Sequence, residues 1–260
     1  MEQKLQKLKK FNLIMGALHL VQGIAMIFLA TSVIQKIAEF SPMITQNFVD
    51  FDVETQSLFT ASKDLFQLPF GIMVASFLLI SAAAHGLIYI MSDKYFDGLK
   101  KGINKFRWFE YALSSSIMIV LIATLFGIHD IATLILIFAA NAAMNLFGLD
   151  MELLNSGAKK GDNVKWGPFI WGSIAGLAPW VAILSYMLAT GNFDQTPWFV
   201  WAIVIAYFIA FNTFPINMIL QYKAVGKWKD YLYGERVYII LSLVAKSVLA
   251  WLVLFGAMQP

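Results

Sequence analysis

Residues 236–257 read RVYIILSLVAKSVLAWLVLFGA, an apolar run with one lysine, Lys246, near its middle. A helix needs about 20 apolar residues to cross the hydrocarbon core of a bilayer, since each residue advances it by about 1.5 Å. The run meets this length. It predicts a transmembrane helix that carries an amine at mid-membrane depth.

Six further apolar runs of similar length precede this one. Their approximate limits are residues 11–33, 66–91, 106–126, 131–149, 167–189 and 197–220. Backbone groups that face lipid must form hydrogen bonds within their own segment, so each run is expected to be a helix. The whole chain, residues 1–260, is therefore expected to form one all-α domain. It is a seven-transmembrane-helix bundle in the lipid bilayer of the cell membrane.

The composition also indicates a membrane protein, since 59% of the residues are hydrophobic and only 13% are charged, against about 25% charged in soluble domains. The net charge of +3 is too small to predict a nucleic-acid partner, and the lack of cysteine excludes disulfides and thiolate chemistry. Three scattered histidines give no metal-ligand spacing. Neither a nucleophile elbow nor a phosphate-binding loop is present, so an enzyme is not expected.

The basic residues predict the orientation of the bundle, because loops that face the cytoplasm carry an excess of lysine and arginine. Sixteen of the 19 basic residues precede the first run or lie in alternate loops: Lys4, Lys7, Lys9, Lys10, Lys94, Lys100, Lys101, Lys105, Arg107, Lys159, Lys160, Lys165, Lys223, Lys227, Lys229 and Arg236. The loops on the opposite side carry only Lys36 and Lys63. The N-terminus is therefore expected in the cytoplasm and the C-terminus outside the cell.

The first outer loop, residues 34–65, is long and mostly acidic. Within it, residues 49–54 (VDFDVE) alternate apolar and acidic side chains, which is the period of a half-buried strand. The loop is therefore expected to contain a short β-hairpin. Because an isolated hairpin is only marginally stable in water, this one is expected to pack on the helix ends or on a second protomer.

Few ionisable residues remain inside the predicted helices once the loops are assigned: Lys246, Glu110, His19 and His85, with Arg107 at the edge. A charge at this depth costs about 2.5–3.5 kcal/mol on insertion scales, and such residues are functional by default. Lys246 lies roughly 15 Å from the nearer membrane surface, too far for its side chain to reach water. It is either half of a structural ion pair with Glu110 or an amine kept for a Schiff base with an aldehyde.

Glu110 is the expected partner of that amine. It is the only carboxylate predicted within the hydrocarbon depth, and a buried carboxylate needs a positive partner. A protonated Schiff base has the matching need, since an opposite charge keeps it protonated. Arg107, three residues earlier on the same helix face, leaves open the alternative of an ion pair with Glu110 at the interface.

His19 and His85 fall within about two turns of the depth of Glu110, in the cytoplasmic halves of their helices. Each histidine alone could be a hydrogen-bonded core residue. Two of them at the depth of a buried carboxylate indicate instead a polar, hydrated cavity that is able to hold a proton. The sequence leaves both interpretations open.

Two long motifs carry a resemblance to a known family. The first is GER at residues 234–236 with SLVAKS at residues 242–247, and the second is RWFEY at residues 107–111 followed by LSSS at residues 113–116. Shorter matches are Phe11-Asn12, His19-Leu20, Asn141, QYK at residues 221–223 and GKW at residues 226–228. In these motifs the chain resembles the heliorhodopsins over nearly its whole length.

The resemblance implies a retinal photoreceptor of microbial type, with all-trans retinal on Lys246 and Glu110 as its counterion. Ser242 resembles the family's serine near the Schiff base, and His19 and His85 match its cavity histidines, with Arg107 at the cavity edge. Around the retinal the sequence offers thioethers, a flat ring and small polar groups. The residues expected there are Ser114, Met118, Asn141, Met144 and Phe211.

The resemblance also implies a homodimer with the N-terminus inside the cell, in agreement with the charge pattern. The candidate contacts between protomers are the first outer loop and the small-residue segment Gly172–Gly176.

A light sensor is favoured over an ion transporter. Glu110, His19 and His85 all lie on the cytoplasmic side of the lysine, whereas residues 117–126 and 247–258 contain no ionisable side chain. A proton released inward therefore has no evident polar route outward. We expect a slow photocycle that keeps the proton on the cytoplasmic side, moves no net ion and signals to an unknown downstream protein.

Two other classes of function are the alternatives. A light-driven proton pump or light-gated ion channel could use water and the hydroxyl groups of residues 114–116. A retinal-dependent membrane enzyme would need a metal set or nucleophile motif, which the sequence lacks.

Overall fold

The computed structural model describes residues 1–34, 40–157, 163–189 and 197–256 of the chain. Seven helical segments in these ranges are long and apolar enough to cross a membrane: α1 (Glu2–Phe28) with its π-helical continuation η1 (Leu29–Val33), α3 (Phe70–Ile90), α5 (Lys105–Leu125), α6 (Ile131–Leu154), α7 (Gly167–Ala189), α8 (Trp198–Tyr222) and α9 (Tyr231–Gly256). The shorter elements are strands β1 (Met43–Asp52) and β2 (Ser57–Gln67), helix α4 (Ser92–Lys100) and the 3-10 turn η3 (Gly226–Lys229).

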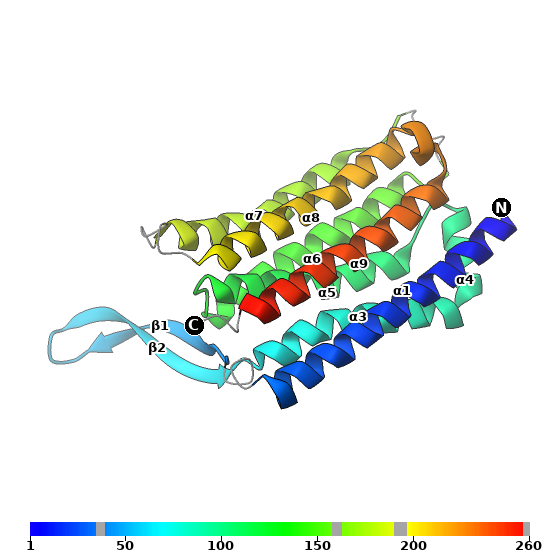
Figure 1. The fold of residues 1–260 in the computed structure, drawn as a ribbon. Coiled ribbons are helices and arrows are strands. Elements are labelled where there is room, and N and C mark those ends of the chain that lie inside the picture. Colours follow the sequence, from blue (N-terminus) through cyan, green and yellow to red (C-terminus); the bar gives the residue numbers. More distant parts are fainter. Residues whose placement is uncertain (35–39, 158–162, 190–196, 257–260) are drawn as a thin grey trace.

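The long helices run side by side along one axis (Figure 1). α1 packs mainly against α3, α6 lies between α5 and α7, and α9 contacts α8, α1 and α3. The β1–β2 hairpin projects from the end of the bundle opposite the N-terminus (Figure 1). The expected seven-helix bundle with a hairpin between its first two long helices is confirmed.

The first helix begins earlier than the predicted residue 11, at Glu2. Its lysine-rich start is helical because Leu5 and Leu8 are buried, in one apolar cluster with Tyr95 of α4. Lys4, Lys7 and Lys10 of the same segment remain exposed. An amphipathic turn thus extends the helix beyond its membrane-crossing length.

Other helix limits also differ from the prediction. α6 continues five residues past the predicted end at 149, and α9 begins five residues before the predicted start at 236. The predicted start at residue 66 is wrong, because β2 runs to Gln67 and α3 begins after Pro69, which cannot continue a strand ladder. The remaining limits agree to within two residues, and residue 257 lies outside the described residues.

The hairpin is longer than expected and its strands pair antiparallel from Met43↔Gln67 to Asp52↔Ser57. The predicted strand over residues 49–54 is wrong at its end, since residues 53–56 form the turn, and Val49 is 66% exposed rather than half-buried. The base of the hairpin is attached to the α5–α6 connection. There the Thr45 N–H donates to the His129 carbonyl at 3.0 Å.

Asp130 fixes this junction from the other side. Its carboxylate accepts hydrogen bonds from the Asn47 N–H at 3.0 Å and from the Thr133 N–H at 2.9 Å, the second of which caps α6. These two N–H groups hold the pKa of the Asp130 carboxyl below its usual range. The hairpin is thus tied to the bundle by backbone contacts at its base, while most of its length is exposed.

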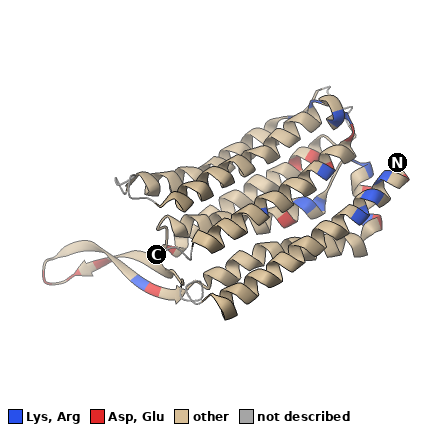
Figure 2. Cartoon of the chain, viewed as in Figure 1, with Lys and Arg blue, Asp and Glu red and all other residues tan. Residues whose placement is uncertain are grey.

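Figure 2 shows lysine and arginine gathered at the end of the bundle that holds the N-terminus, and carboxylates along the hairpin at the other end. Lys36, Lys159 and Lys160 lie outside the described residues. The uneven distribution of basic residues along the sequence therefore corresponds to a difference in charge between the two ends of the bundle. It provides the basis for the orientation proposed below.

Candidate functional site

Lys246 lies inside the bundle, where its side chain is only 4% exposed. Its Nζ donates to Glu110 Oε1 at 2.5 Å and to Ser81 Oγ at 2.6 Å. The Ser81 hydroxyl lies 2.7 Å from the same Glu110 oxygen, within donating distance. Three helices, α9, α5 and α3, therefore bring an amine, a carboxylate and a hydroxyl together.

Arg107 does not join this group, although it lies one turn before Glu110. Its guanidinium pairs with Glu152 of α6, at 2.5 Å, and with Glu235 of α9. The alternative of a Glu110–Arg107 ion pair is thus not the arrangement seen. The Glu110 carboxylate pairs with the amine of Lys246 instead. The Glu110 side chain is 7% exposed.

A cavity of about 310 Å³ begins at Lys246 and extends between α5, α6, α7 and α8. Of the residues expected around retinal, Met118, Met144 and Phe211 line it. Trp180 and Tyr207 add flat walls, with ring centroids 5.5 Å apart. The cavity is apolar along most of its length and ends at a reactive amine, the form of a small-molecule site.

Small residues on α7 give this cavity its shape. Gly172 and Gly176 are buried against α6, and a Cβ at Gly176 would lie 2.4 Å from the Met144 sulfur. The Gly172–Gly176 segment therefore serves packing within the chain. Its predicted role as a contact between protomers is not supported by this placement.

Two of the other expected residues lie behind the cavity wall. Asn141 is fully buried and donates to Ser115 Oγ at 2.8 Å and to Ser116 Oγ at 3.0 Å. Ser115 lines the cavity, so Asn141 acts on it through that hydroxyl. Ser114 is fully buried one turn after Glu110 and is not part of the lining.

A separate cavity of about 30 Å³ lies on the other side of Glu110, large enough for a water molecule. Its lining includes Glu110, Arg107, Ser81, His85 and Ser242. Ser242 thus lies near the expected place. The hydroxyl that contacts the lysine amine, however, is that of Ser81.

The two expected histidines are neighbours, with stacked rings 5.6 Å apart at an interplanar angle of 18°. The Nδ1 atom of His85 lies 2.8 Å from Asn12 Oδ1. His19 is fully buried, and its two ring nitrogens form no hydrogen bond with the described residues. His85 therefore faces the small cavity, while His19 lies behind it.

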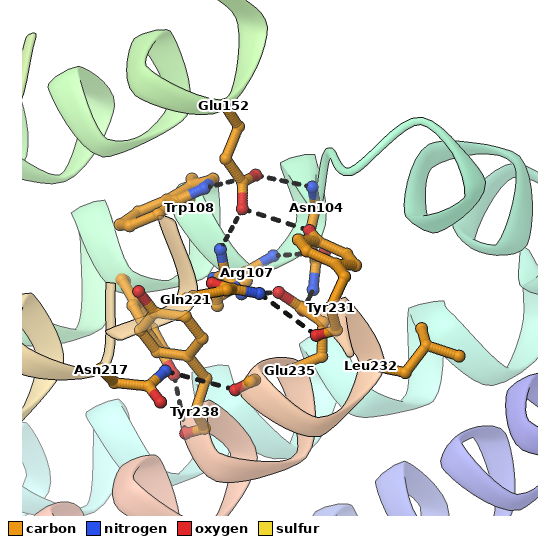
Figure 3. A network of polar contacts seen from close by, with 12 residues as sticks. Asn104, Arg107, Trp108, Glu152, Asn217, Gln221, Tyr231, Leu232, Glu235 and Tyr238 are labelled. Atoms are coloured by element: carbon orange, nitrogen blue, oxygen red, sulfur yellow. Dashed lines mark hydrogen bonds and ion pairs between the residues drawn. The ribbon is translucent and has the colours of Figure 1, made fainter. Parts of the chain in front are cut away.

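Among the buried polar residues in these networks, Ser81, Asn104, Glu152 and Glu235 were not assigned to a site from the sequence. Glu110 was predicted to be the only carboxylate within the hydrocarbon depth, and Glu152 and Glu235 are buried as well, near helix ends beyond the predicted apolar runs. Figure 3 shows Glu152 and Glu235 on opposite sides of Arg107. A signal for Glu235 existed, because residues 235, 242 and 246 are spaced by seven and four and so share one face of α9.

Comparison with known families agrees with this architecture. The heliorhodopsin family model matches residues 8–258, nearly the whole chain. The chain belongs to the heliorhodopsin family. No curated protein matches it. Heliorhodopsins are retinal-binding, light-sensing rhodopsins with seven transmembrane helices, and they are photoreceptors rather than enzymes.

The residues of this heliorhodopsin fit such a group. The cavity is walled by aromatic rings and thioethers, which suit a flat polyene, and it starts at an amine, which suits an aldehyde. A carboxylate stands 2.5 Å from that amine to balance a positive nitrogen.

Proposed function

We propose that all-trans retinal is attached to Lys246 Nζ, with Glu110 as counterion, and that the protein senses light without moving net ions. The observation that carries the proposal is the position of the Lys246 amine, which both ends the apolar cavity and pairs with Glu110. Bound there as a protonated Schiff base, retinal supplies visible absorption and light-driven isomerisation.

The chain's own residues then have defined tasks. The Glu110 carboxylate holds the proton on the Lys246 nitrogen by its opposite charge. The Ser81 hydroxyl fixes the direction of that nitrogen. Trp180 and Tyr207 confine the cavity and exclude water, whereas the flexible Met118 and Met144 adapt to a change of shape.

Light is expected to move the proton of the Lys246 nitrogen away from Glu110 and into the small cavity beside His85. Residues 117–125 of α5 and 247–256 of α9, on the other side of the lysine, contain no ionisable side chain. The proton therefore returns from the side on which it left. Such a cycle changes the charge pattern of the bundle without net transport.

The orientation belongs to the same proposal. We place the lysine-rich end of the bundle, with the N-terminus, in the cytoplasm, and the hairpin outside the cell. The support is the distribution of basic residues seen in Figure 2. The signal is then expected to reach an unidentified protein at the lysine-rich end.

Illuminated vesicles that contain the pigment should show no sustained pH change that an uncoupler abolishes. Lys246→Ala, which should bind no retinal, gives the baseline, and a proton-pumping rhodopsin gives the positive signal. A steady light-driven proton current in either direction would remove the sensor proposal and favour the pump.

The same preparation tests the cavity. The double variant His19→Ala/His85→Ala should form pigment but change several-fold the rate at which the Lys246 nitrogen regains its proton, followed by flash absorption. His129→Ala is the matched control and should keep the parent rate, because His129 lies at the base of the hairpin, where its carbonyl accepts from the Thr45 N–H. Parent kinetics in the double variant would exclude the histidines from the proton's path.

We also propose that the protein is a homodimer in which the hairpin supplies contacts. Phe48, Phe51, Leu58 and Phe59 of the hairpin are all more than 40% exposed, an unusual apolar surface for a solvated hairpin. Native mass spectrometry in mild detergent and in nanodiscs should give the mass of two chains. Phe48→Ser/Phe59→Ser should shift the equilibrium to monomer, whereas a monomeric parent would contradict the proposal.

A further inference from the structure

The ion cluster around Arg107 lies apart from the Lys246 site and has unequal charges. Arg107, Glu152 and Glu235 have side chains exposed by 5%, 2% and 1%. Among the residues that the structure describes, Arg107 is the sole cation paired with either carboxylate. With both acids ionised, the buried cluster would carry one uncompensated negative charge, which is strongly unfavourable out of water.

The other groups around the cluster do not supply the missing positive charge. The titratable and charged groups that face it from outside are Tyr95 of α4, Glu110 and Tyr111 of α5, Tyr222 of α8, and Tyr231 and Tyr238 of α9. Five of these are phenols, which are uncharged at neutral pH. A proton on one of the two carboxylates is the remaining way to reach neutrality within the described part of the chain.

The two carboxylates differ in their hydrogen-bond donors. Glu152 accepts from four groups: Arg107 Nη2 at 2.5 Å, Tyr231 OH at 3.2 Å, and the Asn104 N–H and Trp108 Nε1, both at 2.8 Å. Four donors fill the acceptor positions of an ionised carboxylate and stabilise it, since a proton on either oxygen would displace one of them.

Glu235 accepts fewer of the hydrogen bonds seen in Figure 3. Its partners are Arg107 Nη1, Asn104 Nδ2 at 2.7 Å, and the Tyr231 hydroxyl, which it shares with Glu152. A proton on one of its oxygens would therefore disrupt fewer hydrogen bonds than a proton on either oxygen of Glu152.

We propose that the Glu152–Glu235 pair is a proton-binding site that is occupied by one proton, on Glu235, in the dark protein. With that proton in place the cluster is neutral and its buried charges are balanced. When like charges share one site, one of the two acids keeps its proton. The proposal concerns the folded chain itself and does not depend on retinal.

The position of this site gives it a role in proton exchange. Arg107 lines the small cavity together with Glu110. Tyr231, which donates to Glu152, also lines a cavity of about 570 Å³ bordered by the exposed Lys100 and Lys229. The proton on Glu235 thus lies between the small cavity beside Glu110 and the lysine-rich surface of the bundle.

Isosteric amide variants separate the two acids. Glu235→Gln replaces a neutral acid by a neutral amide, so its thermal unfolding midpoint should stay within about 2 °C of the parent. Glu152→Gln removes the charge that balances Arg107, and its midpoint should fall by about 10 °C or the chain should fail to fold. Asp150→Asn, an exposed carboxylate on the same helix as Glu152, is the control and should match the parent.

Infrared absorption of the full chain in nanodiscs at neutral pH, with and without retinal, tests the proton directly. A carbonyl band of a buried, protonated carboxylic acid should be present in the parent, persist in Asp150→Asn and Glu110→Gln, and disappear in Glu235→Gln. The proposal is overturned by a parent without the band, by a band that survives Glu235→Gln, or by a Glu235→Gln variant as unstable as Glu152→Gln. A light-sensing parent that lacks the band would leave the retinal proposal intact and remove only this one.

Discussion

Replacing Lys246 by alanine is expected to abolish the visible absorption band that appears when all-trans retinal is added to the protein. The amine is the group at the end of the apolar cavity that can form a covalent bond with an aldehyde. Lys246→Arg should lose the band as well, because a guanidinium keeps the positive charge beside Glu110 but is not a nucleophile at neutral pH. Lys223→Ala, at the lysine-rich surface, should keep the parent spectrum.

The alanine variant is also expected to be less stable, and this loss of stability must be distinguished from the loss of retinal attachment. It leaves the Glu110 carboxylate buried without its cation, which costs about 3–5 kcal/mol. The double variant Lys246→Ala/Glu110→Gln removes both charges and should recover most of this stability, measured by thermal unfolding. It should nevertheless form no pigment. A normal band in any of these Lys246 variants would end the proposal of covalent attachment at this residue.

The sequence revealed the bundle and its central ion pair for the same physical reason. Hydrocarbon tolerates few polar residues, so the seven helices appear as long apolar runs and the lysine and glutamate within them stand out. Lys246 and Glu110 could therefore be paired without a structure, since each was the charge most in need of a partner. The structure places their side-chain atoms 2.5 Å apart.

The same argument failed at the helix ends. Glu152 and Glu235 lie beyond the predicted limits of their apolar runs and were assigned to loops, where a carboxylate has no need of burial. Their helices continue because Arg107 and Asn104 give both acids buried partners, the Asn104 backbone N–H for Glu152 and its side-chain Nδ2 for Glu235. A hydropathy pattern cannot predict such partners, because Arg107, Glu152 and Glu235 come from three separate helices, α5, α6 and α9.

Ser81 shows the limit of arguments made within one helix. Ser242, one turn before Lys246, was expected near the amine because it resembles the family's serine near the Schiff base. The hydroxyl in contact with the amine comes instead from α3, more than 160 residues away in sequence. Which faces of different helices meet depends on packing, and the sequence of a single helix does not contain that information.

Glu110→Gln is expected to shift the visible band strongly to longer wavelength while leaving pigment formation intact. The amide has nearly the shape of the carboxylate and can still contact Ser81 Oγ, which lies 2.7 Å from Glu110 Oε1 in the parent. It lacks the negative charge that stabilises positive charge on the Lys246 nitrogen in the dark state. Excitation moves that positive charge away from the nitrogen. Loss of the counterion therefore raises the energy of the dark state more than the energy of the excited state. The energy difference between the two states becomes smaller, and the absorption band moves to longer wavelength.

The pH at which the Lys246 nitrogen loses its proton distinguishes a counterion from a residue that only shapes the site. Without the carboxylate the Lys246 nitrogen should release its proton at lower pH than in the parent, since an opposite charge 2.5 Å away favours the protonated form. Glu110→Asp, which keeps the charge, and Ser81→Ala, which keeps the carboxylate, should both show much smaller changes in a spectral pH titration. If Glu110→Gln titrates and absorbs as the parent does, the negative charge that balances this nitrogen must come from another group. The other buried carboxylates among the described residues, Glu152 and Glu235, both contact Arg107, so that result would also require the Arg107 cluster to rearrange.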